Sequence, residues 1–213
     1  LCPDAGYRIT PGAVFTGLAA AEVMVIGQAP GVTEVEAGRP FNASSGRRLF
    51  QWLAQAGWEE SDFRAQHYMT AVTKCFPGKS DSGRGDRVPS KDEQTLCRSF
   101  LLAEIRLVDP RLIIPVGGLA IRLFYAASVK LREVIGRADY ISPEVLKSMA
   151  TPFDLAQSEH LRKYDPGKSR NGRWIVPLPH PSGASAWPNL ADNQALIVRA
   201  TKILGELRLG WRL

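Results

Sequence analysis

The stretch Glu22-Val23-Met24-Val25-Ile26-Gly27 is a short apolar run that ends in glycine. Runs of this kind, without alternation of polar and apolar residues, are typical of strands buried in a parallel sheet. Three more segments have the same character: Tyr68 to Lys74, Arg111 to Gly117 and Arg173 to Pro179. Apolar residues at helical spacing follow these runs at Ser45 to Gly57, Ser90 to Val108, Gly118 to Ala127 and Leu190 to Leu207. The alternation predicts an α/β fold, a three-layer αβα sandwich around a mainly parallel four-stranded sheet.

The composition is that of one globular domain. The chain has 213 residues, of which 45% are hydrophobic and 23% are charged. This length fits a single core and the charge content excludes a disordered chain, so we expect one domain over residues 1–213. No apolar run reaches the roughly 20 residues of a membrane-spanning helix. The first residues lack the charged-then-apolar plan of a signal peptide, so we expect neither a membrane protein nor a secreted one.

Basic residues are in excess, and part of the excess lies outside the strand–helix alternation. Lys and Arg number 27 against 21 Asp and Glu, which gives a net charge of +6. A surplus of this size is compatible with a polyanionic partner. Two segments break the alternation: the Gly/Ser/Pro-rich Phe76 to Pro89, and the long Val129 to Gly172, with a predicted short helix around Pro143 to Met149. We interpret both as surface excursions of the single domain.

The loops after the strands are where a ligand is expected, because parallel sheets bind ligands at the carboxyl ends of their strands. The first loop reads Gly27-Gln-Ala-Pro-Gly31, and Gly38-Arg-Pro-Phe-Asn42 follows it. This is not a dinucleotide fingerprint, because the glycine spacing differs and no helix is expected directly after it. Its backbone donors, amide and aromatic ring suit a flat heteroaromatic ligand on which Phe41 stacks. The alternative is two structural turns, with Phe41 in the core.

His180 is the one histidine at a predicted strand end. It opens the segment His180-Pro-Ser-Gly-Ala-Ser-Ala-Trp187, and the prolines on both sides of it restrict its backbone. This placement favours a functional side chain, with a solvated loop histidine as the alternative. For His67 and His160 we expect surface or capping roles.

The three cysteines, Cys2, Cys75 and Cys97, are odd in number and widely spaced. In a chain without an export signal this argues against a disulfide framework. Two interpretations stay open on this evidence alone: isolated core thiols, or metal ligands.

Taken together, these motifs resemble the uracil-DNA glycosylase superfamily, and its iron–sulfur branch, the fourth and fifth families, most of all. The resemblance rests on Gly27-Gln-Ala-Pro-Gly31, Gly38-Arg-Pro-Phe41, Met69-Thr-Ala-Val-Thr-Lys-Cys75 and His180-Pro-Ser182. It covers Cys2 to Gly136 and Arg173 to Leu207, and leaves an insertion at about residues 137–172 without a counterpart. It implies a monofunctional glycosylase of base excision repair. Such an enzyme hydrolyses the N-glycosidic bond of uracil, or of another deaminated base flipped out of DNA, and leaves an abasic site.

The resemblance also implies roles for single residues. His180 is expected to donate a hydrogen bond to a base carbonyl, with Gln28 assisting, and Phe41 to stack on the base. Further base-binding residues are expected at Gly27, Ala29, Ala71 and Ser182, and DNA contacts at Arg39 and Trp187. Trp187 is a candidate wedge in the duplex, with a core tryptophan at a helix entry as the alternative.

A 4Fe–4S cluster is implied for the cysteines, because this branch holds one with four thiolates. Cys75 and Cys97 match the second pair of ligands, and Cys2 matches the second member of the first pair. The fourth ligand is then expected just upstream of Leu1.

The chain departs from these families at the acidic position. The fourth family has Glu where Gln28 stands, and the fifth has Asp where this chain reads Asn42-Ala-Ser-Ser45. We expect Gln28 or Asn42 to orient the water instead, and solvated roles for Glu34 and Glu36. Ala71 stands where the fourth family reads uracil with Asn, so we expect broadened base specificity.

Two alternatives follow from these departures: a DNA-binding relative that keeps the pocket and the cluster but has weak or no activity, and a small-molecule enzyme on a flavodoxin-like sheet. With the glycosylase hypothesis, we expect DNA as partner, no membrane, a monomer, and a cytoplasmic location (nucleoid-associated if the source is prokaryotic).

Overall fold

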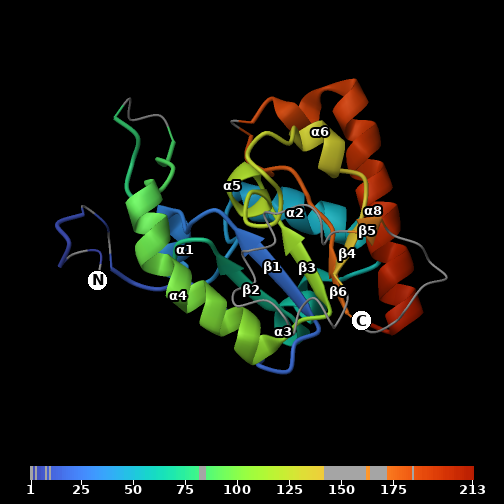
Figure 1. Cartoon of the computed structure of the whole chain (residues 1–213), viewed down its shortest axis with the longest axis horizontal. Coiled ribbons are helices and arrows are strands. Elements are labelled where there is room, and N and C mark those ends of the chain that lie inside the picture. The colour runs from blue at the N-terminus through green and yellow to red at the C-terminus, as the bar shows by residue number, and fades with distance from the viewer. Residues whose placement is uncertain are drawn as a thin grey trace.

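The computed structural model describes residues 2, 4–7, 9, 11–81, 85–141, 162–163, 172–183 and 185–213. Within these residues one sheet has six strands in the order β2-β1-β3-β6-β4-β5 (Figure 1). The strands are β1 Val23–Gly27, β2 Tyr68–Ala71, β3 Leu112–Pro115, β4 Asp139–Ile141, β5 Arg162–Lys163 and β6 Arg173–Ile175. The first four in the sheet order are parallel, whereas β4 pairs antiparallel with both β6 and β5.

Helices cover both faces of the sheet, as the predicted three-layer sandwich requires. The helices are α1 Val32–Ala37, α2 Ser44–Gln55, α3 Glu60–Gln66, α4 Lys91–Val108, α5 Gly118–Ile121, α6 Leu131–Val134 and α8 Ala191–Trp211, with a 3₁₀ turn η3 Trp187–Asn189. One apolar cluster joins the sheet to α2, α3 and α8, and a second joins it to α4, α5 and α6. Not one helix in the described part of the chain combines the length and apolar character needed to cross a membrane.

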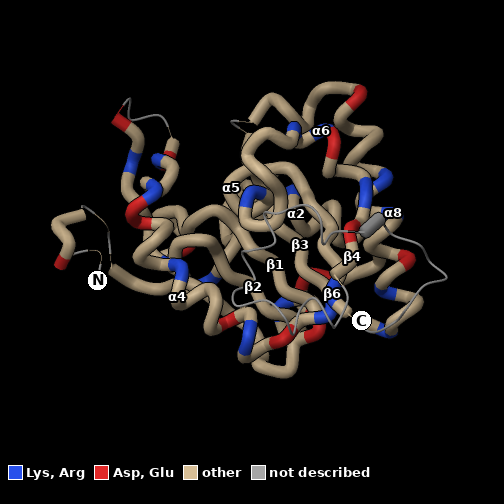
Figure 2. The backbone as a smooth tube through the Cα atoms, viewed as in Figure 1, with Lys and Arg blue, Asp and Glu red and all other residues tan. Residues whose placement is uncertain are grey.

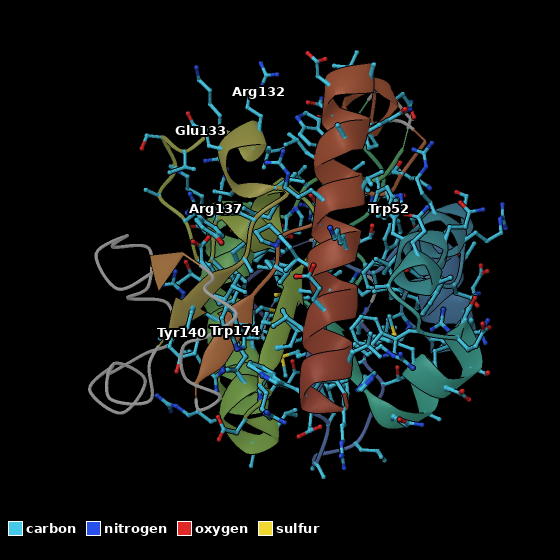
Figure 3. All side chains as sticks on the ribbon, turned by 90° about the vertical axis from the view of Figure 1, so that its right-hand side faces the viewer. Trp52, Arg132, Glu133, Arg137, Tyr140 and Trp174 are labelled. Atoms are coloured by element: carbon cyan, nitrogen blue, oxygen red, sulfur yellow. The ribbon has the colours of Figure 1, made fainter. Side chains whose placement is uncertain are left out.

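The first strand lies at the centre of this core, as its sequence predicts. Val23 and Val25 belong to the cluster on the α2 and α8 face, Met24 and Ile26 belong to the other, and all four are fully buried. In Figure 3, α8 runs along the sheet between Trp52 on one side and Tyr140 and Trp174 on the other. A strand buried on both faces needs apolar residues throughout, which is why its sequence does not alternate.

Three expectations about the fold are wrong in detail. The sheet has six strands and not four, because β4 and β5, which are short and partly polar, extend its edge from within the predicted excursion. A helix, α1, begins directly after Gly31, where none is expected. The helix after β3 ends at Ile121 and not near Ala127. The helix predicted around Pro143 to Met149 lies outside the described residues.

His67 stands at the C-cap of α3, but its side chain is not on the surface. It is only 4% exposed, and its ring meets those of Phe63 and Trp58 edge-on. Burial lowers the pKa of His67 from 6.5 to about 4. His160, which shares the same expectation, lies outside the described residues.

The low pKa of His67 predicts a loss of stability in acid. The unfolded chain binds a proton near pH 6.5, and the folded protein binds it only near pH 4. Stability is therefore complete above the first value and falls between the two, by up to about 3 kcal/mol. We expect His67→Phe, which keeps the ring, to remove this part of the pH dependence. Urea unfolding at about pH 7 and about pH 5 measures it, and an unchanged difference in the variant would contradict the assignment.

Candidate active site

A cavity of about 560 Å³ opens at the carboxyl ends of the parallel strands. Both motif segments after β1 line it, as do the end of β2 and the segment after β6. The predicted site residues that the structure brings together there are Gly27, Gln28, Ala29, Phe41, Ala71, His180 and Ser182. The strand-end placement expected from the sequence therefore assembles most of the predicted site.

Phe41 is held in an uncommon backbone conformation, with φ at 52°. Its ring packs on Gly27 so closely that a Cβ there would lie 2.9 Å from Phe41 Cζ, which explains the glycine. A left-handed φ in an aromatic residue costs energy and survives only where its surroundings fix it. Such strain is frequent at ligand sites, which favours a binding role for this ring.

Two charged side chains from different helices, Glu34 of α1 and Arg64 of α3, fix the backbone of Phe41. Glu34 Oε1 accepts the Phe41 N–H at 2.6 Å, and its other oxygen accepts the N–H of Gly31. The Arg64 guanidinium donates to the carbonyl oxygens of Pro40 and Phe41, at 2.8 Å each. Bonds to charged groups are stronger than neutral ones, so the two loops form one rigid unit.

The solvated role expected for Glu34 is wrong. Its carboxylate joins the two motif loops, and it is half-buried, whereas Glu36 is exposed as expected. A local signal was present: Glu34 stands three residues after Gly31, at the position where a carboxylate caps a helix start. Arg64 gave no such signal, because its contacts with Pro40 and Phe41 span more than 20 positions.

His180 is held as a neutral imidazole. The Ser182 N–H donates to His180 Nδ1 at 3.2 Å, and burial lowers the pKa of the ring. With Nδ1 accepting, the ring proton is on Nε2, so His180 brings a neutral N–H donor to the cavity. Gly117, at a φ of 87°, makes room for it, since a Cβ there would lie 2.9 Å from His180 Cδ2.

A known protein family matches the part of the chain that contains these strands and loops. The model of the uracil DNA glycosylase superfamily matches residues 15–205, which include β1, the cavity and most of α8. The chain belongs to the uracil-DNA glycosylase superfamily. The resemblance predicted from the motifs is thereby confirmed, and an unrelated small-molecule enzyme is no longer supported.

Similar curated members of the superfamily are type-4 uracil-DNA glycosylases. The protein of Pyrobaculum aerophilum is 35% identical over 118 residues, 54% of each chain. That of Thermotoga maritima is 32% identical over 102 residues, 48% of each chain. That of Sulfurisphaera tokodaii is 35% identical over 101 residues, 47% of this chain and 42% of the relative. The chain spans about half the length of the curated relatives it matches.

Asn42 lies outside the lining of the candidate active-site cavity. Two guanidinium nitrogens of Arg39, Nε and a terminal one, donate to Asn42 Oδ1 at 3.0 and 2.6 Å. The Asn42 amide donates to the Thr33 carbonyl at 3.4 Å. Asn42 does not line the cavity, so the water-orienting role expected for it finds no support. Arg39 itself is exposed next to the cavity loops, and its DNA contact stays a prediction.

Trp187 begins the turn η3 that leads into α8. It is half-buried, packs against both apolar clusters and does not line the cavity. This packing gives it the role of a core residue at a helix entry, and the wedge role stays a prediction.

The three cysteines meet at a second cavity, of about 380 Å³, lined largely by apolar side chains. Cys2 comes from the N-terminal segment, Cys75 from the loop after β2, and Cys97 from α4. Burial raises the pKa of Cys2, and the nearby thiols of Cys97 and Cys75 raise it further. Their convergence argues against isolated core thiols.

Three thiols around one cavity are the ligand type of an iron–sulfur cluster. Within the described part of the chain no three His, Cys, Asp or Glu side chains surround a point where one metal ion could bind. A 4Fe–4S cluster places each thiolate on a different iron, so its ligands do not need to meet at one point. The cavity between the thiols gives the space, and the thiols supply the ligand type.

Lys74 lines the thiol cavity and contacts Thr70 and Ala71, which line the first cavity. The sequence alone predicts no role for its side chain. Its Nζ donates to Thr70 Oγ1 at 2.6 Å, to the Ala71 carbonyl at 2.8 Å and to Glu104 Oε2 at 2.6 Å. The side chain is buried, which lowers its pKa, while Glu104 opposes that effect. A buried cation paired in this way fixes the end of β2, where Ala71 lines the candidate site.

Proposed function

We propose that the protein hydrolyses the N-glycosidic bond of uracil or another deaminated base in DNA and leaves an abasic site. The observation that carries the proposal is His180, a neutral N–H donor at the cavity, with the Phe41 ring fixed among the same lining residues. A flat base with carbonyl oxygens needs both a stacking surface and a donor.

The bond breaks with its electron pair leaving on the base. Charge therefore develops on a base carbonyl oxygen, to which the His180 Nε2–H is directed in this proposal. One such preorganised donor contributes roughly 3 kcal/mol to transition-state stabilisation. The base must first leave the stack, and Phe41 replaces part of the lost stacking, worth about 1–3 kcal/mol in single-strand complexes.

The DNA partner is supported by the net charge of +6 and by the named activity of the similar proteins. Binding through phosphates makes affinity fall steeply with salt. The alternative of an inactive DNA-binding relative rests only on missing acidic residues, and the similarity to enzymes does not favour it.

We also propose a 4Fe–4S cluster on Cys2, Cys75 and Cys97. When bound, such a cluster cross-links the N-terminal segment, the loop after β2 and α4. A fourth thiolate upstream of Leu1 stays a prediction, as do the monomeric state and the cellular location.

A substrate panel tests the proposed function. Duplex and single-stranded oligonucleotides with one uracil, hypoxanthine, xanthine or mismatched thymine are incubated with protein and then treated with alkali, which cuts abasic sites. We expect cleavage of at least one of them. DNA binding without any cleavage would favour the inactive relative instead.

Ala71 predicts that the protein excises more than one base of this panel. It is buried at the end of β2 and has no polar side chain to read the base edge. We expect Ala71→Asn to raise the ratio of uracil to hypoxanthine excision by about 10- to 100-fold, because an unpaired buried amide rejects the wrong base. Ala71→Val is the matched control, with similar volume and no amide. Equal ratios in the two variants would contradict the role.

A further inference from the structure

A carboxylate outside the family motifs, that of Asp86, lines the cavity. Among the described lining residues the acidic side chains are Glu34 and Asp86. Both Glu34 oxygens already accept backbone N–H groups, so that carboxylate is committed to holding the loops. Gln28, which lines the cavity, is an amide and takes no proton. Among the described residues, Asp86 is therefore the lining carboxylate with an oxygen, Oδ2, that accepts no hydrogen bond from a described donor.

The two oxygens of Asp86 have different surroundings. Oδ1 accepts a hydrogen bond from Lys79 Nζ at 2.7 Å. Oδ2 approaches the end of the first motif, 3.1 Å from where a Cβ on Gly31 would lie. The Asp86 side chain is 36% exposed, so water reaches it. One oxygen is thus ion-paired, and the other lies beside the loop that forms the cavity.

The position of Asp86 is built into its loop. Lys79 and Asp86 form an antiparallel bridge, closed by hydrogen bonds from Ser80 N–H to Gly85 O and from Arg87 N–H to Gly78 O. The next residue, Arg87, donates through two nitrogens to Glu93, which is almost fully buried at the start of α4. Figure 2 shows charges of both signs along this loop. The pairing fixes Asp86 relative to the core.

Sheet order puts Asp86 and His180 on different flanks of β1. β2, whose following loop carries Asp86, borders β1 on one side, and β3 and then β6, which leads to His180, lie on the other (Figure 1). In this hydrolysis the water attacks the sugar carbon from the face opposite the leaving base. The proposal requires that a base held at His180 turns that face of the sugar toward Asp86, which lines the same cavity.

We propose that Asp86 is the general base that activates the attacking water, an inference that rests on the proposed function. Asp86 Oδ2 takes a proton from the water as its oxygen bonds to C1′ of the sugar. The bond between C1′ and the base nitrogen breaks, and its electron pair leaves with the base, stabilised by the His180 N–H. The base anion is then protonated by solvent, and Asp86 returns its proton to solvent.

The test compares Asp86→Asn with Asp81→Asn under single-turnover conditions, on the panel base that the wild type excises fastest. Asp81 lies in the same loop and is exposed, but it does not line the cavity. We expect Asp86→Asn to slow excision by about 100- to 10,000-fold and Asp81→Asn to change it by less than about threefold. Both variants should bind the oligonucleotide and unfold at the same temperature.

A second pair of variants separates chemistry from loop structure. Lys79→Met removes the ion pair but leaves the carboxylate, so we expect its single-turnover rate to fall far less than that of Asp86→Asn. Asp86→Ala should regain activity in formate, whose carboxylate can take the proton. An equal loss in Lys79→Met and Asp86→Asn, without formate rescue, would overturn the proposal. So would an Asp86→Asn variant as fast as wild type, whereas a wild type that cleaves no panel base overturns the proposed function itself.

Discussion

His180→Ala is expected to excise the base about 100- to 1,000-fold more slowly than the wild type in single-turnover assays. The variant removes the neutral N–H donor that the Ser182 N–H orients through Nδ1. Charge on the leaving base then has no preorganised donor on that side. Because the donor acts on the transition state, DNA affinity should change little. The measurement is the excision rate at saturating enzyme, with binding followed separately.

His180→Gln is the matched variant for this prediction. Its amide N–H restores a donor without a ring, so an intermediate rate is expected. Burial lowers the pKa of His180, so the neutral form persists below the usual histidine range. The wild-type rate should therefore not rise on mild acidification, as it would if an imidazolium were the donor. Full activity in His180→Ala would remove the central assignment.

Cys97→Ala is expected to abolish iron binding and the broad visible absorption of a cluster. It should also lower the free energy of unfolding by roughly 2–5 kcal/mol, the range for losing a native cross-link in a small domain. The reason is that the proposed cluster would link Cys97 on α4 to Cys75 in the loop after β2 and to Cys2 in the N-terminal segment, which line the same cavity. Iron analysis, absorption spectra and urea unfolding on anaerobically purified protein measure both effects.

Leu101→Ala is the control for destabilisation alone. Leu101 lies one turn further along α4, is 1% exposed and does not line the thiol cavity. Its truncation costs about 2–5 kcal/mol through a core cavity, yet the protein should keep its iron. Colourless, iron-free wild-type protein, purified anaerobically, would contradict the cluster.

The sequence predicted the centre of the fold because buried parallel strands carry a local pattern. The run from Glu22 to Gly27 became β1, and the loops after the parallel strands met at one edge, as topology demands. The predicted start of a helix at Ser90 is confirmed by local bonds: Ser90 Oγ accepts from the Glu93 N–H, and the Glu93 carboxylate accepts from the Ser90 N–H. Patterns that lie within a few residues of one another were the reliable ones.

What the sequence could not predict depends on contacts between distant segments. Arg64 reaches the Phe41 loop from another helix, and Asp86 reaches Gly31 from the loop after β2. Neither contact has a signature at its own position. Strand β4, which lies between β6 and β5, has only three residues and forms by pairing with them, so its own sequence carries little signal. For Asn42 the motif position predicts a site residue, but Arg39 donates to its side-chain oxygen and Asn42 does not line the cavity.

The grip of Glu34 and Arg64 on the Phe41 loop has a consequence for DNA binding. Ordering a loop around a ligand lowers affinity, since conformational entropy is lost at the moment of binding. Here that entropy is lost during folding, because the Glu34 carboxylate and the Arg64 guanidinium bind the backbone of Phe41 and hold its left-handed conformation. In the proposed function, the Phe41 ring is thus ordered before any nucleotide leaves the duplex. Little of the stacking energy of a flipped base would then be spent on ordering the protein.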